Sequence, residues 1–199
     1  MGRLTLVLGG ARSGKSRFAQ RLATTAPQPV VYVATAEASD AEMHARIARH
    51  RAERPSAWQT IELPRGLDRR LGETAGPNAT LLVDCLSVWL SNELLVLQNT
   101  TMPDEVLDAA SASEAEQRLL DATGRFVERA IARDGETIVV SNEVGSGIVP
   151  AYPLGRIYRD ILGRANQAVA RHASAVYLVV AGIGVDLRGL EQRFGSDVP

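Results

Sequence analysis

Short runs of apolar and β-branched residues recur along the chain, and stretches with a helical period separate them. The runs cover residues 4–8, 30–34, 80–84, 137–141 and 176–180. Each run is typical of a strand buried on both faces. The intervening helical patterns cover residues 15–25, 40–52, 66–71, 114–133 and 154–172. Strands that alternate with helices predict an α/β fold whose sheet is mostly parallel and flanked by helices.

Two segments show neither the apolar runs typical of strands nor a helical period. Residues 98–113 are small and polar with one proline, which favours a loop. Residues 186–199 mix charge and glycine, so we expect a loosely held tail. The apolar stretch 81–97 contains Asp84, Asn92 and Glu93, which a membrane-spanning helix rarely tolerates, and we expect no membrane span.

The first predicted strand leads into a glycine-rich segment, GGARSGKS, at residues 9–16. This segment meets the pattern G-x-x-x-x-G-K-[ST] between a strand and a helix, the context in which the pattern indicates a phosphate-binding loop. Backbone N–H groups and the helix dipole then hold the phosphates, Lys15 reaches the β and γ phosphates, and Ser16 provides a hydroxyl ligand for Mg²⁺. The expected fold is a P-loop NTPase of the RecA-like kind. The alternative is a glycine-rich turn that binds nothing.

A carboxylate is expected on the metal side of such a site, at the end of a neighbouring strand. Asp84 follows the apolar run LLV and is the candidate second protein ligand of Mg²⁺. An acid just past a strand can also be a helix cap or a turn residue, and this alternative stays open.

Length, charge and cysteine content narrow the class of protein. A chain of 199 residues without a break in composition predicts a single domain over residues 1–199. The net charge of −1 gives no general attraction to nucleic acid. Cys85 is the single cysteine, and the first residues do not resemble a secretory signal, so we expect a cytoplasmic protein.

The basic residues are unusual, because 21 of the 22 are arginine and Lys15 is the single lysine. The chain thus has a compact ammonium where a point charge must reach phosphate oxygens. A switch GTPase would need a second lysine in its guanine-reading Asn-Lys-x-Asp motif, so that class is excluded. A small-molecule kinase or a nucleotidyltransferase remains.

A second candidate site lies in EMHARIARHRAERPSAW, residues 42–58, where arginines at 46, 49, 51 and 54 surround His50. Positive neighbours favour a neutral imidazole, which could act as a nucleophile while the arginines hold phosphates. The alternative is that basic residues simply complement the dipole of a last helical turn.

These motifs together resemble the bifunctional adenosylcobinamide kinase and adenosylcobinamide-phosphate guanylyltransferase family of cobalamin biosynthesis. The resemblance rests on GGARSGKS, on YVAT after the second strand, on the His50 segment, and on NEVGSGIVP at residues 142–150. It implies phosphorylation of adenosylcobinamide with ATP or GTP, followed by transfer of GMP from GTP through a GMP-histidine intermediate. His50 aligns with the histidine that carries GMP.

The resemblance also implies a set of nucleotide contacts, beside the catalytic roles of His50 and Lys15. The implied contacts are Gly9, Gly10, Ala11, Arg12, Ser13, Gly14, Lys15, Ser16, Ala34, Thr35, Ala36, Arg51, Ala52, Glu53, Arg54, Glu62 and Asp84. Family members are similar in forming homotrimers. Residues 142–150 would line the corrinoid site, or would form a flexible turn containing glycines.

The other two histidines are not expected to act. His44 lies too early in the motif, and His172 falls on the apolar stripe of residues 154–172, which predicts a packed core histidine. Two other functions stay open from the residues alone. They are a P-loop kinase of another small alcohol and a non-catalytic regulatory module that depends on nucleotide.

Overall fold

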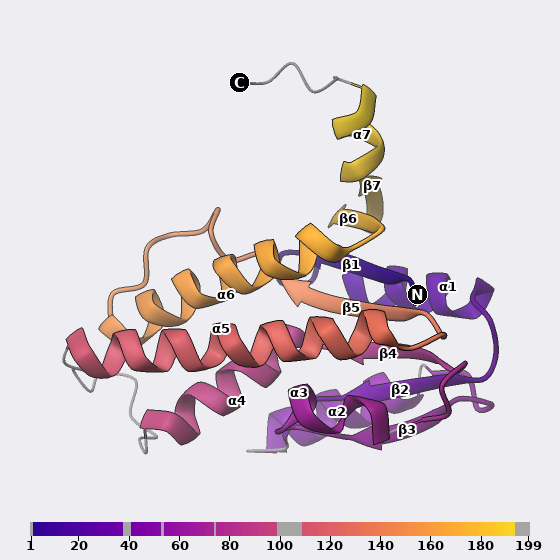
Figure 1. Cartoon of the computed structure of the whole chain (residues 1–199), viewed down its shortest axis with the longest axis horizontal. Helices are drawn as coiled ribbons and strands as arrows, with labels where there is room; N and C mark the ends of the chain where they lie inside the picture. The colour runs from indigo at the N-terminus through magenta and orange to yellow at the C-terminus, as the bar shows by residue number, and fades with distance from the viewer. Residues whose placement is uncertain (1, 38–40, 53, 74, 99–108, 194–199) are drawn as a thin grey trace.

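The computed structural model describes residues 2–37, 41–52, 54–73, 75–98 and 109–193 (Figure 1). Within these ranges the strands form one seven-stranded sheet in the order β3-β2-β4-β5-β1-β6-β7. The strands are β1 (Leu4–Gly9), β2 (Val30–Ala34), β3 (Gln59–Glu62), β4 (Thr80–Asp84), β5 (Thr137–Asn142), β6 (Ala175–Val180) and β7 (Ile183–Asp186). Neighbouring strands are parallel, except that β7 runs antiparallel to β6.

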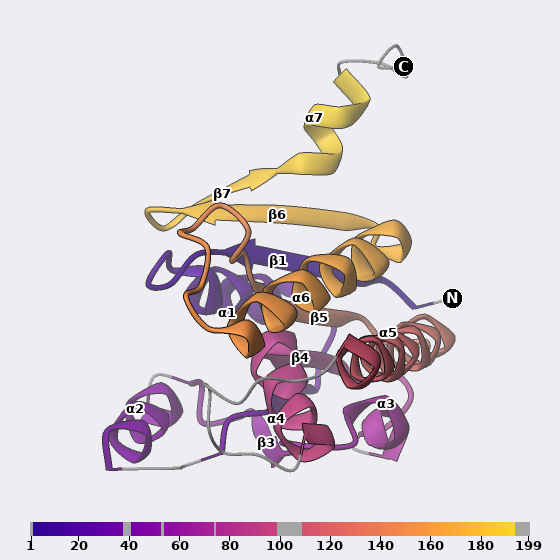
Figure 2. The same ribbon diagram turned by 90° about the vertical axis from the view of Figure 1, so that its left-hand side faces the viewer.

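Helices cover both faces of the sheet. They are α1 (Lys15–Thr25), α2 (Ala41–Ala52), α3 (Leu67–Arg70), α4 (Leu86–Gln98), α5 (Ala109–Ala132), α6 (Pro153–His172) and α7 (Leu187–Arg193), with a 3₁₀ turn η1 (Leu71–Glu73) after α3. Figure 2 shows α1 and α2 on one side of the sheet and α3 to α6 on the other, while α7 stands away from the body. The predicted fold class, a mostly parallel sheet flanked by helices, is confirmed.

The apolar runs of the strands are buried on both faces, as their composition predicts. Successive side chains point to opposite faces, so Val7 and Val140 pack beneath α1 while Leu6 and Val139 pack beneath α4, α5 and α6. All four are fully buried. The core therefore holds the strand ends, where the candidate site lies, in fixed register.

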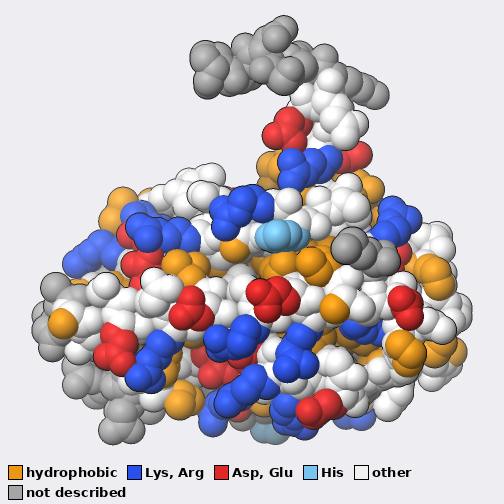
Figure 3. Space-filling model, in the orientation of Figure 1, with side chains coloured by type: hydrophobic (Ala, Val, Ile, Leu, Met, Phe, Trp, Pro, Cys, Tyr) orange, Lys and Arg blue, Asp and Glu red, His pale blue; other side chains and the backbone are white. Residues whose placement is uncertain are grey.

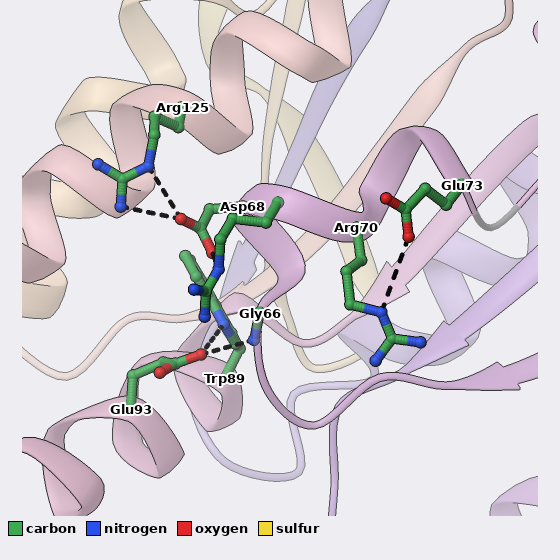
Figure 4. A network of polar contacts seen from close by, with 8 residues as sticks. Gly66, Asp68, Arg70, Glu73, Trp89, Glu93 and Arg125 are labelled. Carbon is green, nitrogen blue, oxygen red and sulfur yellow. Dashed lines mark hydrogen bonds and ion pairs between the residues drawn. The ribbon is translucent and has the colours of Figure 1, made fainter.

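Polar contacts tie α3, α4 and α5 together over one face of the sheet (Figure 4). Nε of Arg125 on α5 donates a hydrogen bond of 2.9 Å to Oδ2 of the buried Asp68 on α3, and Nη2 forms an ion pair of 2.9 Å with the same oxygen. Glu93 Oε1 on α4 accepts hydrogen bonds from the Gly66 amide at 2.7 Å and from the Trp89 indole at 3.0 Å. These bonds give α3, a helix of only 4 residues, a fixed place in the layer.

Several predicted boundaries were wrong, mostly in the second half of the chain. Residues 109–113, predicted as loop, form the start of α5, and residues 99–108 of that segment lie outside the described part. The predicted strand 80–84 is confirmed as β4, but the helix α4 that follows it was not predicted, and α4 includes residue 98 of the predicted loop. Residues 187–193 of the predicted tail form α7, and residues 194–199 lie outside the described part.

His172 is exposed, which corrects its prediction as a core residue. The buried stripe of α6 continues from Val169 to Ala173, which lies in the core just after the helix. His172, the last residue of the helix, therefore falls beside the stripe and turns to the solvent.

On the face formed by α5 and α6, acidic and basic side chains are interspersed (Figure 3). This face thus presents no extended field of one sign, in agreement with the net charge of −1. In the described ranges, every helix is too short or too polar to cross a membrane.

Candidate functional site

The predicted site residues follow the carboxyl ends of neighbouring parallel strands, which is where open α/β sheets bind their ligands. In the sheet register Gly9 of β1 pairs with Asn142 of β5, and Ala34 of β2 pairs with both Asp84 of β4 and Glu62 of β3. Segments that are spread in sequence from residue 9 to residue 142 thus end at one edge of the sheet. This edge is the candidate site.

The glycine-rich loop leaves β1 at this edge and turns directly into α1. Arg12 and Gly14 have positive φ angles of 57° and 90°, and the Ser13 amide donates to the Gly10 carbonyl at 3.3 Å. Gly14 is the N-cap of α1, and in the described structure no side chain caps that helix. The start of α1 therefore faces the glycine-rich loop, and the positive end of its dipole favours an anion there.

The glycine-rich loop is open to the solvent at the residues before α1. Gly10, Ala11 and Arg12 are exposed, whereas Lys15 and Ser16 are half-buried. The Lys15 ammonium donates to the Gly10 carbonyl at 3.1 Å, so it lies over the loop beside the amides of α1. A phosphate in the loop would meet both a positive charge and a row of N–H donors.

Asp84 belongs to a polar chain that crosses the sheet edge. The Tyr32 hydroxyl donates to Asp84 Oδ2 at 2.7 Å, and the Arg54 guanidinium lies 3.5 Å from the centre of the Tyr32 ring. Burial, and after it the nearby charge of Asp84, raise the pKa of Tyr32 far above its ordinary value. The phenol therefore keeps its proton and remains a donor to the carboxylate.

Thr35 holds the ends of β2 and β4 together. It is completely buried, and its hydroxyl donates to the Cys85 carbonyl at 2.8 Å and accepts from the Cys85 amide at 2.7 Å. Asn92 of α4 donates to the Thr35 carbonyl at 2.9 Å. The Thr35 side chain thus supports the site, and of the predicted segment 34–36 it is Ala36 that is partly exposed.

His50 occupies the last turn of α2, half-buried, and Arg51 and Ala52 beside it are exposed. Glu53 lies outside the described residues. Among the described contacts, none joins His50 to the glycine-rich loop. Its segment reaches the site through Arg54, which stacks on Tyr32 and donates to Thr60 Oγ1 at 3.3 Å. Glu62 is exposed at the end of β3.

The oxygen ligands available at this edge suit a Mg²⁺ ion that is held mainly by the phosphates of a substrate. The described residues contain no cluster of three or more His, Cys, Asp or Glu side chains that could hold a metal alone. Mg²⁺ usually keeps several waters and takes one or two protein oxygens together with substrate phosphates. The Ser16 hydroxyl and the Asp84 carboxylate, of which Tyr32 engages Oδ2, are such oxygens.

Three residues at the site were given no role from sequence. Tyr32 lies within YVAT and Glu143 within NEVGSGIVP, so both motifs were noticed but these side chains were not singled out. Gly182, in the turn between β6 and β7, donates its amide to the Ser13 carbonyl at 2.8 Å. No sequence signal marks Gly182, because the contact joins residues 169 positions apart, the difference between 182 and 13.

Comparison with known proteins identifies the family of the chain. Residues 5–187 match the family model described as cobinamide kinase / cobinamide phosphate guanyltransferase. The chain is 42% identical over 184 residues to the bifunctional adenosylcobalamin biosynthesis protein CobP of Pseudomonas aeruginosa, a match covering 92% of this chain and 96% of that protein. It is 41% identical over 186 residues to CobU of Salmonella typhimurium, covering 93% and 99% of the two chains.

The CobU protein of Escherichia coli is 40% identical over 185 residues, with 93% of this chain and 99% of that protein covered. The match thus runs from β1 to the start of α7 and includes both candidate motifs. It favours the cobinamide substrate over another small alcohol and over a non-catalytic module. The chain therefore belongs to the family of bifunctional cobinamide kinases and cobinamide-phosphate guanylyltransferases.

Proposed function

We propose that this enzyme phosphorylates the hydroxyl of adenosylcobinamide with ATP or GTP at the glycine-rich loop, and then transfers GMP from GTP through His50. The observation that carries this proposal is the chain of contacts from Asp84 through Tyr32 to Arg54. It links the phosphate-binding edge of the sheet with the segment that carries His50. One nucleotide site, built within a single domain, would then serve both reactions.

In the kinase step, the loop amides, the start of α1 and Lys15 hold the β and γ phosphates. Ser16 and Asp84 would hold Mg²⁺, which neutralises charge on the phosphates. Positioning and electrostatic stabilisation supply most of the rate in such transfers. The nucleotide contacts proposed for this step are Gly9, Gly10, Ala11, Arg12, Ser13, Gly14, Lys15, Ser16, Ala34, Thr35, Ala36, Glu62 and Asp84.

In the guanylyltransferase step, an imidazole nitrogen of His50 attacks the α phosphorus of GTP, and pyrophosphate leaves. An oxygen of the cobinamide phosphate then attacks the same phosphorus and releases His50. Arg51 and Arg54, with Ala52 and Glu53 between them in sequence, would hold the triphosphate. The Tyr32 ring supports this by fixing the Arg54 guanidinium in a stacked position.

The segment after β5 is proposed to contact the corrinoid. Ile148 is 97% exposed, and Val149 and Tyr152 are exposed beside it. Such a set of exposed apolar side chains on one loop is unusual unless a ligand or partner covers them. Because this segment begins next to the glycine-rich loop, a bound corrinoid would present its hydroxyl to the γ phosphate.

We further propose a homotrimer in the cytoplasm, where ATP and GTP are available. The trimer rests on the family resemblance. Light scattering of the purified enzyme, with and without GTP, tests it directly: a trimeric mass supports the proposal and a monomer refutes it.

The test of the covalent step uses GTP labelled at the α phosphate. After incubation with Mg²⁺ and denaturation, the wild type should retain label that is stable in alkali and released by acid, as expected for a phosphoramidate. His50→Ala should retain none. His44→Ala is the matched control, because both histidines lie on α2, and it should label like the wild type. Label that persists in His50→Ala would show that another residue carries GMP.

A further inference from the structure

Glu143 lies closer to the phosphate-binding loop than its sequence position indicates. It follows β5 directly, and its amide donates to the carbonyl of Gly9, the first residue of the loop, at 3.1 Å. In the sheet order β5 lies between β1, which leads into the loop, and β4, which ends at Asp84. Glu143 thus sits at the sheet edge between the phosphate site and the proposed metal ligand.

The carboxylate of Glu143 is held in one orientation by the segment that follows it. Oε1 accepts a hydrogen bond from the Gly145 amide at 2.7 Å, and Oε2 accepts one from the Ser146 amide at 3.3 Å. Each oxygen keeps a lone pair for another donor. Partial burial raises the pKa of Glu143, but the bonds from Gly145 and Ser146 outweigh it, and the pKa falls below its ordinary value. The group is therefore ionised at neutral pH.

No other described acid has this position. The two strands beside β1 are β5 and β6, and β6 is followed by the turn of Ala181 and Gly182. Asp84 lies one strand further away and receives the Tyr32 hydroxyl. Glu143 is half-buried and begins the segment proposed to contact the corrinoid. Of the described acids, Glu143 is thus the one that both follows the strand next to the loop and begins that segment.

We propose that Glu143 is the general base of the kinase step. Its carboxylate accepts the proton of the cobinamide hydroxyl while that oxygen forms a bond to the γ phosphorus. The bond between the γ phosphorus and the β–γ bridging oxygen breaks, and the nucleoside diphosphate leaves with the electron pair. This assignment rests on the proposed function. In a loose phosphoryl-transfer transition state the proton leaves late, so a weakly basic, well-oriented carboxylate is sufficient.

The two reactions of the enzyme differ in their need for such a base. The acceptor in the kinase step is a hydroxyl, which must lose a proton. The acceptor in the guanylyltransferase step is a phosphate, which is already ionised at neutral pH and has no proton to lose. Loss of Glu143 should consequently slow one reaction and leave the other unchanged.

The test measures both reactions in Glu143→Gln. The glutamine side-chain oxygen can still accept from the Gly145 amide, so the shorter of the two bonds to the turn is retained, but the side-chain amide cannot take a proton. The kcat for phosphorylation of adenosylcobinamide should fall on the order of 10²-fold or more, with the KM for nucleotide unchanged. Transfer of GMP to supplied adenosylcobinamide phosphate should keep its wild-type rate. Glu128→Gln, an exposed glutamate on α5, is the matched control.

Three outcomes overturn the assignment. A wild-type kinase rate in Glu143→Gln would show that no proton passes to this carboxylate. An equal loss of both activities, or a lowered unfolding midpoint that accounts for the loss, would show that Glu143 only supports the turn. If the wild-type protein itself fails to phosphorylate adenosylcobinamide, the proposed function is wrong, and the assignment of a base is wrong with it.

Discussion

Gly9, the last residue of β1, has no room for a side chain. A Cβ there would lie 2.7 Å from the Val179 carbonyl on the neighbouring strand β6, and it would also collide with Ser13 Oγ. The serine can rotate, but the carbonyl belongs to the sheet and cannot move without shifting β6. At Gly10, one residue later, a Cβ would meet no described atom within 4 Å, and the φ angle is not positive.

The pair Gly9→Ala and Gly10→Ala therefore isolates the cost of this collision. Both substitutions remove similar freedom from the unfolded chain, which stabilises each variant by about 0.4–1 kcal/mol. Gly9→Ala alone must also accommodate an overpacked methyl group, which costs about 1–3 kcal/mol. The difference between the two variants should thus be about 1–3 kcal/mol in the free energy of unfolding. For a chain of this length that corresponds to about 2–4 °C in Tm for each kcal/mol.

Equilibrium unfolding in urea, followed by the fluorescence of Trp58 and Trp89, measures this difference. Gly9→Ala should unfold at the lower urea concentration, and it should also bind a fluorescent GTP analogue more weakly, because its loop amides are displaced. Identical unfolding midpoints for the two alanine variants would refute the reasoning, since the collision with β6 would then have no cost.

Two further predictions concern buried groups beside the site. Tyr32→Phe keeps the ring under the Arg54 guanidinium but removes the hydroxyl that donates to Asp84. It should lower the free energy of unfolding by about 0.5–1.5 kcal/mol. It should also raise the Mg²⁺ concentration that the kinase step needs. Unchanged values of both in urea and Mg²⁺ titrations would contradict the contact. Cys85 is buried, and burial raises the pKa of its thiol to about 11. The native protein should therefore resist iodoacetamide at pH 7, whereas the protein unfolded in urea should react fully. Mass spectrometry measures the extent of labelling. Rapid native labelling would show that the thiol is accessible.

The sequence by itself determined the features that depend on neighbouring residues. The glycine-rich loop is local, because its shape needs glycines and a helix start within eight residues, and its position between β1 and α1 follows from the pattern. The buried strands were equally clear, since a parallel strand covered on both faces requires an uninterrupted apolar run. The His50 segment and its relation to the family could also be recognised as motifs, although its role in transfer stays a prediction.

Some elements could not be predicted because their signals are short or mixed. β3 and β7 have four residues each, too few for a period, and their stability comes from pairing with β2 and β6. In α4 the buried residues recur at helical spacing, but exposed apolar residues at its end obscure the pattern. His172 was misplaced because spacings of three and four leave open whether residue 172 or residue 173 follows Val169 in the buried stripe, and it is Ala173 that is buried.

Only the tertiary structure decided which distant residues meet at the site. It placed β5 beside β1 and β2 beside β4, and so brought Glu143 to the Gly9 carbonyl and Tyr32 to Asp84. Strand order depends on how whole faces of helices and strands bury one another. The free energy of this burial comes from contacts between residues far apart in sequence, so the local spacing of residues does not reveal it. The phosphate-binding motif was thus present in the sequence, while the candidate base and the proposed link between the two reaction sites emerged only from the fold.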